Sequence, residues 1–389
     1  MKRRICVVTG TRSEYGLLKP LIDELRRSRS VDLKLVATGM HLSPEFGLTY
    51  KEIEEDGITI DEKVETLLSS DTPVGVSKAV GLGIISFSET FRRLDPELVV
   101  GLGDRFELFA AVVAAMIAGI PVAHLHGGEL TKGAIDDAIR HSITKMSQLH
   151  FTAAQEYRKR VIQLGEDPDR VFNVGAIGLD NIRNMKLLSR GRLERELGLK
   201  ITPPTLLVTF HPATLDRRTA GSQFKELLGA FDEMKELNLI FTMPNADHEA
   251  REIMHMIERF VGANKKRARA FVSLGRLKYL SAVKWADGVV GNSSSGIIEV
   301  PGFRKGTVNI GDRQEGRIIP ASVINCPPDR RRIVESIRLL LSDEFRERLR
   351  DVVNPHGDGR AAGRIAAILI SYPLDGIVKK GFHSLGVKK

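Results

Sequence analysis

The segment Leu98–Leu125, LVVGLGDRFELFAAVVAAMIAGIPVAHL, decides the fold class. It begins with a short apolar run, Leu98–Leu102, that is typical of a buried strand. An apolar-rich stretch long enough for a helix follows at Arg105–Ala118, and a second short run closes the segment at Val122–Leu125. Two strands joined by a helix are the repeating unit of a parallel sheet, so this segment predicts an α/β protein.

The same alternation continues on both sides of this segment. Before it, we expect strands at Arg4–Thr9 and Leu33–Thr38 with a helix near Tyr15–Arg27 between them. After it, a helix at Ile135–Ser147 precedes a short strand at His150–Thr152. These elements together predict one Rossmann-like half of the molecule, with helices on both faces of its sheet.

A second series of strands begins after the Gly175–Asn181 region. The expected strands are Leu206–Phe210, Leu239–Met243, Ala270–Ser273, Gly288–Gly291 and Thr307–Ile310. The charged segment Leu187–Pro204 lies before them, and we interpret it as a polar connection. The chain is therefore predicted to have two Rossmann-like halves.

Composition limits the class of protein. The chain has 389 residues, of which 42% are hydrophobic and 28% charged, as in soluble two-domain proteins. Its net charge of +9 is compatible with an anionic substrate, with nucleic acid or with a merely basic surface. The basic clusters Lys265–Arg267 and Arg330–Arg332 have few aromatic residues among them, so we expect no nucleic-acid partner.

The cysteines and the apolar runs indicate a cytoplasmic protein. Cys6 and Cys326 are far apart in the sequence and show no zinc-ligand spacing, so reduced thiols are expected. The apolar run in the first twelve residues is too short for a signal peptide. The stretch Leu108–Ala123 contains a glycine and a proline and is too short to span a bilayer, so no membrane partner is expected.

Two loops of the first half follow expected strands, at the end of a parallel sheet where ligands bind. Residues 10–12, GTR, offer backbone N–H groups at a helix start, and Arg12 adds a cation. The alternative is an ordinary turn with a surface arginine.

The second of these loops, GLGDR at 101–105, starts like a dinucleotide fingerprint. Phe106 stands where the third glycine of that fingerprint would be, which argues against NAD. Asp104 offers an acid–base group beside a phosphate clamp at Arg105, or it caps the following helix.

The next expected strand leads into residues 124–129, HLHGGE, and the acids Asp136 and Asp137 follow. His126, Glu129 and the aspartates suit proton transfer, since adjacent carboxylates disfavour each other's charge. The alternative is that the acids complement the dipole of a helix start. The HxH spacing lacks a convincing third ligand, so no metal site is predicted.

Two loops of the second half have the chemistry of a phosphate site. His211 follows a strand, where it could donate to a diphosphate or transfer a proton. Residues 291–296, GNSSSG, combine the hydroxyls of Ser293, Ser294 and Ser295 with a helix start. Glu299, one turn further on, could bind a ribose diol, whereas the alternative for the loop is a polar helix cap.

Eight motifs in this order resemble one known family. They are GTR, GDRFE, HLHGGE with IDDAIRHSITK, FHPAT, MPNAD, GNSSSGIIE, NIGDRQEGR and HGDGRA. The chain is similar over nearly its whole length to the hydrolysing UDP-N-acetylglucosamine 2-epimerases, and most to their sialic-acid-pathway branch. The resemblance implies a glycosyltransferase-B-like fold with the active site in the cleft between two Rossmann-like domains. The expected domains are residues 1–176 and 177–358, with 359–389 forming a helix that crosses back to the first.

The resemblance also implies a two-step reaction without NAD or any other cofactor. A base removes the C2 proton while UDP leaves, and water then adds to the 2-acetamidoglucal to give N-acetylmannosamine. It assigns acid–base roles to Asp104, Asp136 and Asp137 and places His211 near the diphosphate. The implied nucleotide contacts are Arg12, Arg105, Asn245, Ser293, Ser294, Glu299 and Arg313.

Two positions depart from the family pattern. His126 stands where many relatives have glutamate, so either this histidine or Glu129 would take the acid–base role. Gly16 replaces a polar residue of the first loop. The alternatives that stay open are a diacetamido-trideoxy or GDP-linked sugar, a glycosyltransferase of the same architecture and a non-catalytic sensor. A homodimer or homotetramer is expected from the resemblance alone.

Overall fold

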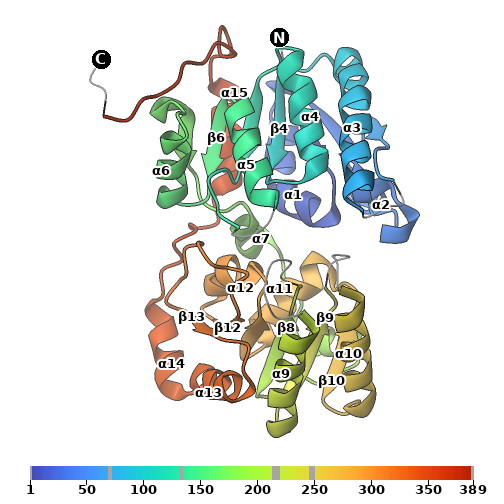
Figure 1. The fold of residues 1–389 in the computed structure, drawn as a ribbon, viewed down its shortest axis with the longest axis vertical. Helices are drawn as coiled ribbons and strands as arrows, with labels where there is room; N and C mark the ends of the chain where they lie inside the picture. Colours follow the sequence, from blue (N-terminus) through green and yellow to red (C-terminus); the bar gives the residue numbers. More distant parts are fainter. Residues whose placement is uncertain (1, 69–71, 132–134, 213–219, 245–249, 387–389) are drawn as a thin grey trace. The chain divides into compact units, whose positions relative to one another are not determined.

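The computed structural model describes residues 2–68, 72–131, 135–212, 220–244 and 250–386 (Figure 1). The contacts within the chain divide it into two compact units. The first unit comprises Met1–Glu129, Ile135–Asn181 and His356–Lys389, and the second comprises Leu130–Ala134 and Ile182–Pro355.

The first unit is built on a seven-stranded sheet whose strand pairs are all parallel. The strands are β1 (Arg3–Thr9), β2 (Val31–Thr38), β3 (Glu62–Val64), β4 (Leu98–Leu102), β5 (Val122–Leu125), β6 (Leu149–Thr152) and β7 (Val171–Asn173). Their order across the sheet is β3-β2-β1-β4-β5-β6-β7. The order therefore reverses between β1 and β4, which are neighbours in the sheet.

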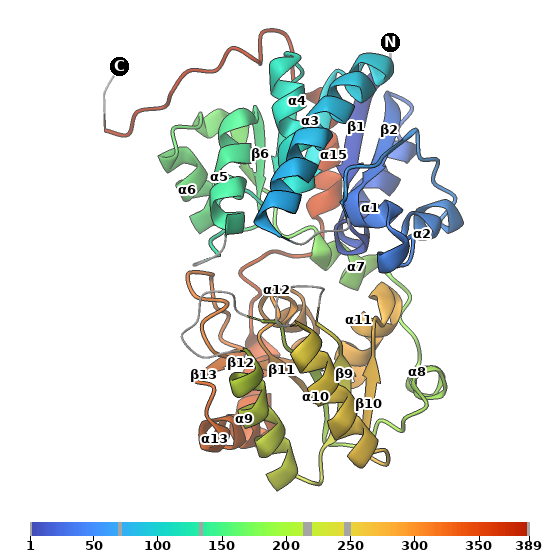
Figure 2. The same cartoon turned by 45° about the vertical axis from the view of Figure 1, so that its right-hand side comes forward.

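Helices cover both faces of this sheet because its strands are apolar on both sides. Ile5 and Val7 of β1 belong to one core, and Cys6 and Val8 belong to the other. The helices of this unit are α1 (Arg12–Arg27), α2 (Tyr50–Glu55), α3 (Pro73–Leu94), α4 (Phe106–Ile117), α5 (Ile135–Met146), α6 (Gln155–Gln163) and α15 (Ala361–Ser371). Helices α1 and α15 pack on the first core, and α3, α4 and α5 pack on the second (Figure 2).

A buried carboxylate holds α15 in the first unit. Asp180 lies in α7 (Gly178–Asn184), the helix in which the chain passes from one unit to the next. Its two carboxylate oxygens accept the backbone N–H groups of Ala361 and Ala362 at 3.0 and 2.9 Å. These N–H groups open α15 and have no partner within the helix, so Asp180 caps it from a distant part of the chain.

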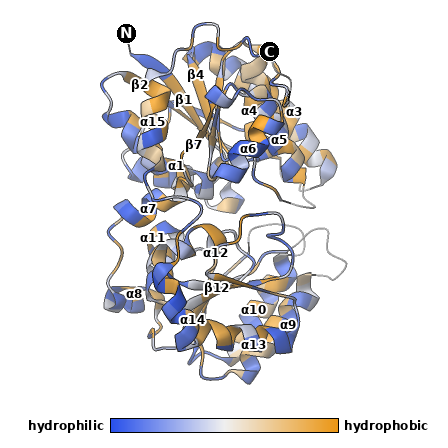
Figure 3. Ribbon diagram, turned by 90° about the vertical axis from the view of Figure 1, so that its left-hand side faces the viewer, coloured by the Kyte–Doolittle hydropathy of each residue, from blue (hydrophilic) through white to orange (hydrophobic). Residues whose placement is uncertain are grey.

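The second unit has a six-stranded sheet, again parallel throughout. Its strands are β8 (Thr205–Thr209), β9 (Asn238–Thr242), β10 (Ala268–Phe271), β11 (Gly288–Gly291), β12 (Gly306–Ile310) and β13 (Val323–Cys326). Their order is β10-β9-β8-β11-β12-β13, so this sheet reverses between β8 and β11. Figure 3 shows the apolar strands of each unit between helices with hydrophilic outer surfaces.

The helices of the second unit pack on two cores in the same manner. They are α8 (Arg190–Leu197), α9 (Ala220–Glu233), α10 (Ala250–Ala263), α11 (Gly275–Trp285), α12 (Ser295–Ile298), α13 (Arg330–Leu341) and α14 (Asp343–Arg348). Short 3-10 turns lie at Gly39–Leu42, Pro44–Phe46, Pro168–Arg170, Val300–Phe303 and Leu349–Asp351. Among the described residues, no helix is both long and apolar enough to cross a membrane.

The structure confirms the expected strands to within two residues and corrects one segment. The prediction of a polar connection at Leu187–Pro204 is wrong, because α8 lies within it. Leu193 and Leu197 of this helix are buried in the second unit's core, a pattern that the many charges of the segment obscured. Strands β3, β7 and β13 were not expected. They mix polar and apolar residues, as in Glu62–Val64 and Val323–Cys326, and so lack a continuous apolar run.

A glycine fixes the approach of β8 and β11 at the reversal point of the second sheet. Gly291 has a φ of +141°, and a Cβ atom there would lie 1.9 Å from the backbone oxygen of Thr209. A side chain at this position would therefore clash with rigid backbone and also force a strained conformation.

We expect Gly291→Ala to lower the free energy of unfolding by about 2–4 kcal/mol. The matched control is Gly262→Ala, because Gly262 lies in α10 with no neighbouring atom within 4 Å of the methyl group that this substitution adds. That control should gain about 0.5–1 kcal/mol from helix propensity. Urea denaturation of both variants checks the prediction, and equal stabilities would contradict it.

Candidate active site

The predicted site residues lie beside the reversal points of the two sheets. Asp104 follows β4 and Arg12 follows β1, the two strands that meet at the first reversal. His211 follows β8 and Ser293 follows β11, the two strands that meet at the second. In open α/β sheets, ligands bind at the carboxyl ends of strands at such points.

A buried arginine connects the acids of the first unit. Arg140 of α5 is 4% exposed. Its Nη2 binds the Asp104 carboxylate, and its Nη1 donates to Oδ1 of Asp137 at 3.4 Å and to the Glu129 backbone oxygen at 2.8 Å. One guanidinium therefore links residues from the β4 turn, the HLHGGE loop and α5, and we call these four residues the Arg140 cluster.

Sequence reasoning missed Arg140, although a signal for it exists. The run IDDAIRH places this arginine three residues after Asp137, so both side chains lie on one face of α5. The structure also decides between the alternatives for Asp104. The N-cap position of α4 is Arg105, which makes no side-chain cap, so the alternative that Asp104 caps this helix is wrong.

The structure separates the two adjacent aspartates. Asp137 faces Arg140, and its Oδ2 lies 3.6 Å from Nε2 of His141. Burial lowers the pKa of His141, which favours its neutral form. Asp136 is exposed in the first turn of α5. Neighbouring positions of a helix point in different directions, so only Asp137 belongs to the Arg140 cluster, and a proton-transfer role of Asp136 beside it stays a prediction.

His126 and Glu129 form a hydrogen-bonded pair. Nδ1 of His126 donates to Oε1 of Glu129 at 2.8 Å, and its Nε2 accepts the backbone N–H of Ile177 at 3.4 Å. The backbone N–H can only donate, so it fixes the neutral tautomer with the proton on Nδ1. The two residues that competed for one acid–base role are thus coupled to each other.

A glycine shapes the loop that carries this pair. Gly128 has a φ of +79°, and a Cβ there would lie 2.4 Å from the backbone oxygen of Tyr157 in α6. Arg160, also from α6, donates to the Gly128 backbone oxygen. The loop therefore lies directly on α6, which fixes its path and holds His126 at a positive φ of 63°.

The GTR loop does not leave its N–H groups for an anion. Oε2 of Glu14 accepts the N–H groups of Gly10 and Thr11 at 2.7 and 3.0 Å, and Thr11 caps α1 in return. The alternative of an ordinary capped turn is the correct one for these groups. The loop encloses the Glu14 carboxyl, and this loss of water raises its pKa to about 7.

The two predicted arginine clamps of the first unit are held by carboxylates. Arg12 makes a two-point contact with Glu52 of α2, with Nη2 and Nε 2.8 and 2.9 Å from its oxygens. Arg105 makes a similar contact with the buried Glu107 at 3.0 and 3.1 Å. Such pairing orients a guanidinium and partly neutralises it before any ligand binds.

In the second unit, Asn292 ties together the groups at the reversal point. Its side-chain oxygen Oδ1 accepts the backbone N–H of His211 at 2.7 Å, and its Nδ2 donates to the His211 backbone oxygen at 2.8 Å. Arg313 and Gln314 donate to the Asn292 backbone oxygen at 3.1 and 2.7 Å. Burial, aided by the charge of Arg313, lowers the pKa of His211 to about 3, so its imidazole is neutral.

The serine loop leads into a short helix. Helix α12 has four residues and ends at Ile298, and Glu299 is both its C-cap and the N-cap of the 3-10 turn Val300–Phe303. Glu299 therefore lies at the junction of two short turns rather than within one helix. The Ser295 hydroxyl accepts the Tyr279 hydroxyl at 2.7 Å, whereas Ser293 and Ser294 remain partly exposed. Asn245 lies outside the described residues.

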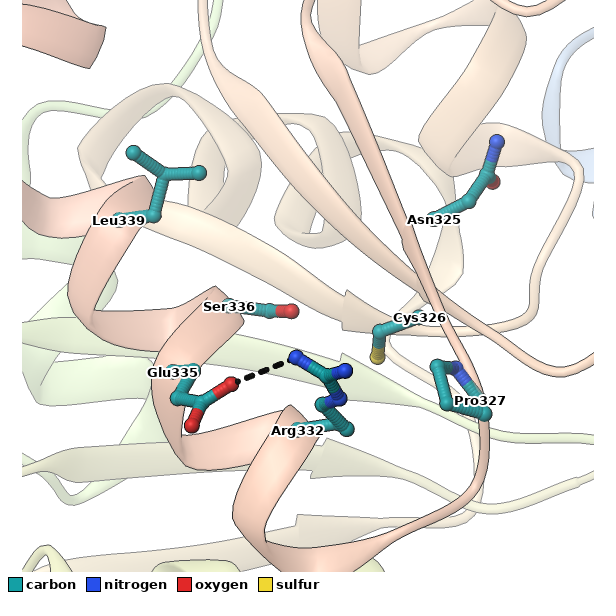
Figure 4. A pocket seen from close by; sticks show the side chains of 7 residues that line it. All are labelled: Asn325, Cys326, Pro327, Arg332, Glu335, Ser336 and Leu339. Atoms are coloured by element: carbon teal, nitrogen blue, oxygen red, sulfur yellow. Dashed lines mark hydrogen bonds and ion pairs between the residues drawn. The ribbon is translucent and has the colours of Figure 1, made fainter.

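The hollow drawn in Figure 4 is separate from these residues. It has a volume of about 390 Å³ and lies between β13 and α13, where Cys326, Arg332 and Glu335 line it. None of the predicted site residues lines it. Among the described residues, no group of three or more histidines, cysteines and acids is placed to hold a metal ion.

Fold and site together define a class of protein. Two parallel-sheet, Rossmann-like units with polar loops at both reversal points are the architecture of glycosyltransferase-B proteins, as expected from the sequence. The structure is similar to that of a Glycyrrhiza uralensis glycosyltransferase of this group, with a TM-score of 0.62 at 12% identity over 97% of this chain and 96% of that chain.

The family is more specific than the architecture. Residues 23–370 match the model of the UDP-N-acetylglucosamine 2-epimerase family. This chain belongs to that family, and it is therefore an enzyme of the UDP-N-acetylglucosamine 2-epimerase type. The family prediction from the sequence motifs is confirmed.

Three relatives are similar to most of the chain. A GDP/UDP-N,N'-diacetylbacillosamine 2-epimerase (hydrolyzing) of Campylobacter jejuni is 44% identical over 83% of this chain and 84% of its own. The polysialic acid biosynthesis protein P7 of Escherichia coli is 38% identical, and the similarity covers 91% of this chain and 90% of that protein. A UDP-N,N'-diacetylbacillosamine 2-epimerase (hydrolyzing) of Legionella pneumophila is 33% identical, and the similarity covers 96% of this chain and 97% of that protein.

A solved structure shows the same fold. The UDP-GlcNAc 2-epimerase of Methanocaldococcus jannaschii in complex with UDP-GlcNAc and UDP has a TM-score of 0.77 at 18% identity. The similarity covers 94% of this chain and 99% of that one. It confirms the predicted fold across both units.

Proposed function

We propose that this enzyme is a hydrolysing 2-epimerase that releases UDP from a 2-acetamido sugar nucleotide and inverts the configuration at C2. The Arg140 cluster carries the proposal, because it collects acid-bearing segments from three parts of the first unit around one buried cation. Elimination and reprotonation need acid–base groups at C2, whereas glycosyl transfer leaves the C2 proton in place and needs none at that carbon. This contrast favours the epimerase over a glycosyltransferase or a sensor.

The substrate that the relatives favour is UDP-N,N'-diacetylbacillosamine. Two of the three relatives described above bear that substrate in their names, and they include the one with 44% identity. UDP-N-acetylglucosamine, which the sequence motifs suggested first, is the second candidate and is supported by the description of the family. Both sugars carry the 2-acetamido group and the C2 proton on which the reaction depends.

The proposed reaction has two balanced steps. A base takes the C2 proton, the C2–H electrons form a C1–C2 double bond, and the C1–O bond breaks so that UDP leaves with its electron pair. Water then adds its oxygen to C1, and C2 receives a proton on the opposite face. Inversion therefore requires two acid–base groups, since one group reaches only one face of the sugar.

The first unit offers two sets of groups for these roles. Asp104 and Asp137 form one set, which Arg140 orients through its charged contacts. The His126–Glu129 pair forms the other, and its carboxylate stabilises the imidazolium that forms when the ring takes a proton. We assign one set to each face of C2.

The proposal gives nucleotide binding to the second unit. Arg313 and the hydroxyls of Ser293 and Ser294 would hold the diphosphate, Glu299 the ribose, and His211 would donate a hydrogen bond as a neutral imidazole. Stabilising the departing diphosphate in this way lowers the barrier, because the C2 proton is only weakly acidic.

Proton NMR in D2O tests the proposed function. With UDP-N,N'-diacetylbacillosamine, we expect release of UDP and of the free C2 epimer carrying deuterium at C2. UDP-N-acetylglucosamine and a GDP-linked diacetamido sugar are run in parallel to rank the substrates. Release of UDP with the C2 proton retained would overturn the elimination mechanism, and no turnover of any substrate despite UDP binding would overturn the enzymatic proposal.

We expect Asp104→Asn to lower kcat on the order of 100-fold or more, because the amide keeps the shape and the contact with Arg140 but cannot accept a proton. UDP affinity, measured by calorimetry, should stay unchanged. Asp95→Asn is the matched control, since Asp95 is an exposed carboxylate of the same unit. Asp104→Asn with kcat at the level of this control would remove Asp104 from the mechanism.

Arg313→Ala should act mainly on binding. Loss of one charged hydrogen-bond donor is expected to weaken UDP affinity about 10- to 100-fold. The midpoint of thermal unfolding is measured as well, to show whether the variant is folded. Arg332→Ala removes the same charge from an exposed ion pair on α13 and serves as the control. Equal UDP affinities of the two variants in calorimetry would refute the assignment of Arg313.

A further inference from the structure

The first histidine of the HLHGGE motif has no role in the proposed mechanism. His124 lies in β5 beside β4, and its side chain is fully buried. No part of its ring is exposed, whereas the side chain of His126 is 15% exposed. His124 is therefore not a candidate for direct proton transfer.

The two ring nitrogens of His124 contact two different elements. Nε2 lies 2.7 Å from the backbone oxygen of Gly103, and Nδ1 lies 3.1 Å from the hydroxyl of Thr144 in α5. A backbone oxygen can only accept, so Nε2 carries the proton and Nδ1 accepts from Thr144. Burial lowers the pKa of His124 to about 3, which keeps this neutral tautomer in place at physiological pH.

The contact with Gly103 controls the direction of Asp104. Gly103 has a φ of +82°, where a glycine peptide can rotate with little steric resistance. Its N–H is held by the Leu125 backbone oxygen at 3.0 Å, and its C=O is held by His124. That C=O belongs to the peptide that joins Gly103 to Asp104, so fixing it fixes the direction in which the Asp104 side chain leaves the backbone.

The contact with Thr144 reaches the other acid of the cluster. Asp137, Arg140 and Thr144 are spaced by three and four residues along α5 and share one face of the helix. Gly127 leaves room for the contact, since a Cβ there would lie 3.0 Å from the Thr144 hydroxyl oxygen and 3.1 Å from Nδ1 of His124. His124 thus bonds the turn that carries Asp104 to the helix that carries Asp137.

We propose that His124 is a positioning residue that fixes the spacing between Asp104 and the acid-bearing face of α5. The inference rests on the proposed function, because it concerns the geometry of the groups that exchange the C2 proton. A displacement of about 1 Å between such groups reduces turnover on the order of 10- to 100-fold. Nucleotide binding belongs to the second unit and should not respond to it.

The experiment compares three substitutions that remove different parts of this connection. In His124→Asn, the shorter amide can accept from Thr144 but cannot reach Gly103, so kcat should fall on the order of 10- to 100-fold. In His124→Gln, the amide nitrogen takes the place of Nε2 and should restore much of kcat. Thr144→Val keeps the contact with Gly103 and should lower kcat only a few-fold.

The matched control is His150→Asn. His150 is in register with His124 on the neighbouring strand β6 and is also fully buried, but it binds Glu166 instead of the acid-bearing elements. Its loss should lower the unfolding temperature while kcat per folded molecule stays unchanged. Circular dichroism gives the folded fraction, and C2 deuterium incorporation gives kcat and KM.

Each result decides the proposal. A fall in kcat for His124→Asn with an unchanged UDP affinity, recovery in His124→Gln and an active His150→Asn would support it. Equal kcat per folded molecule in His124→Asn and His150→Asn would overturn the proposal. The proposed function would remain intact in that case, because the wild-type chain is active. If His124→Asn does not fold, the other two variants decide. Most of the wild-type kcat in His124→Gln with a few-fold loss in Thr144→Val would support the proposal, whereas a tenfold loss in a folded His124→Gln would overturn it. A wild-type chain without any turnover overturns the proposed function and this inference together.

Discussion

The guanidinium of Arg140 is the interaction on which the candidate site depends. Burying a cation is costly unless it is paired and hydrogen-bonded, and Arg140 meets this condition through Asp104, Asp137 and the Glu129 backbone oxygen. The same contacts bring together segments that are far apart in the sequence. The contacts that neutralise the buried Arg140 cation are thus the same contacts that set the arrangement of the acids.

The fold supplies the positions from which these contacts form. Parallel strands that are apolar on both faces need helices on both sides, and the turn after each strand then lies at the same edge of the sheet. Gly128 allows the HLHGGE loop to pass close to α6, and Gly103 adopts the positive φ that the turn after β4 requires. The polar groups of the second unit gather around Asn292 for the same topological reason.

The sequence predicted the repeating pattern well and the pairing of charges poorly. Short apolar runs such as Leu98–Leu102 show their strands directly, because apolar burial is a local property of the sequence. The contacts of Arg140 with Asp104, and of Glu14 with the GTR loop, depend on which loops meet at the edge of the sheet. Only the folded chain determines that, so the contacts of Arg12 with Glu52 and of Arg105 with Glu107 were not predicted from the sequence.

The central claim is that a planar, two-point cation organises the acids for proton transfer at C2. Chemical rescue of Arg140→Ala measures this most directly, with C2 deuterium incorporation as the readout. The account predicts that the variant folds with little turnover and that millimolar guanidinium restores part of it, whereas methylammonium, which carries the same charge without the planar fork, does not. Turnover of the unrescued variant at the wild-type rate would contradict the account.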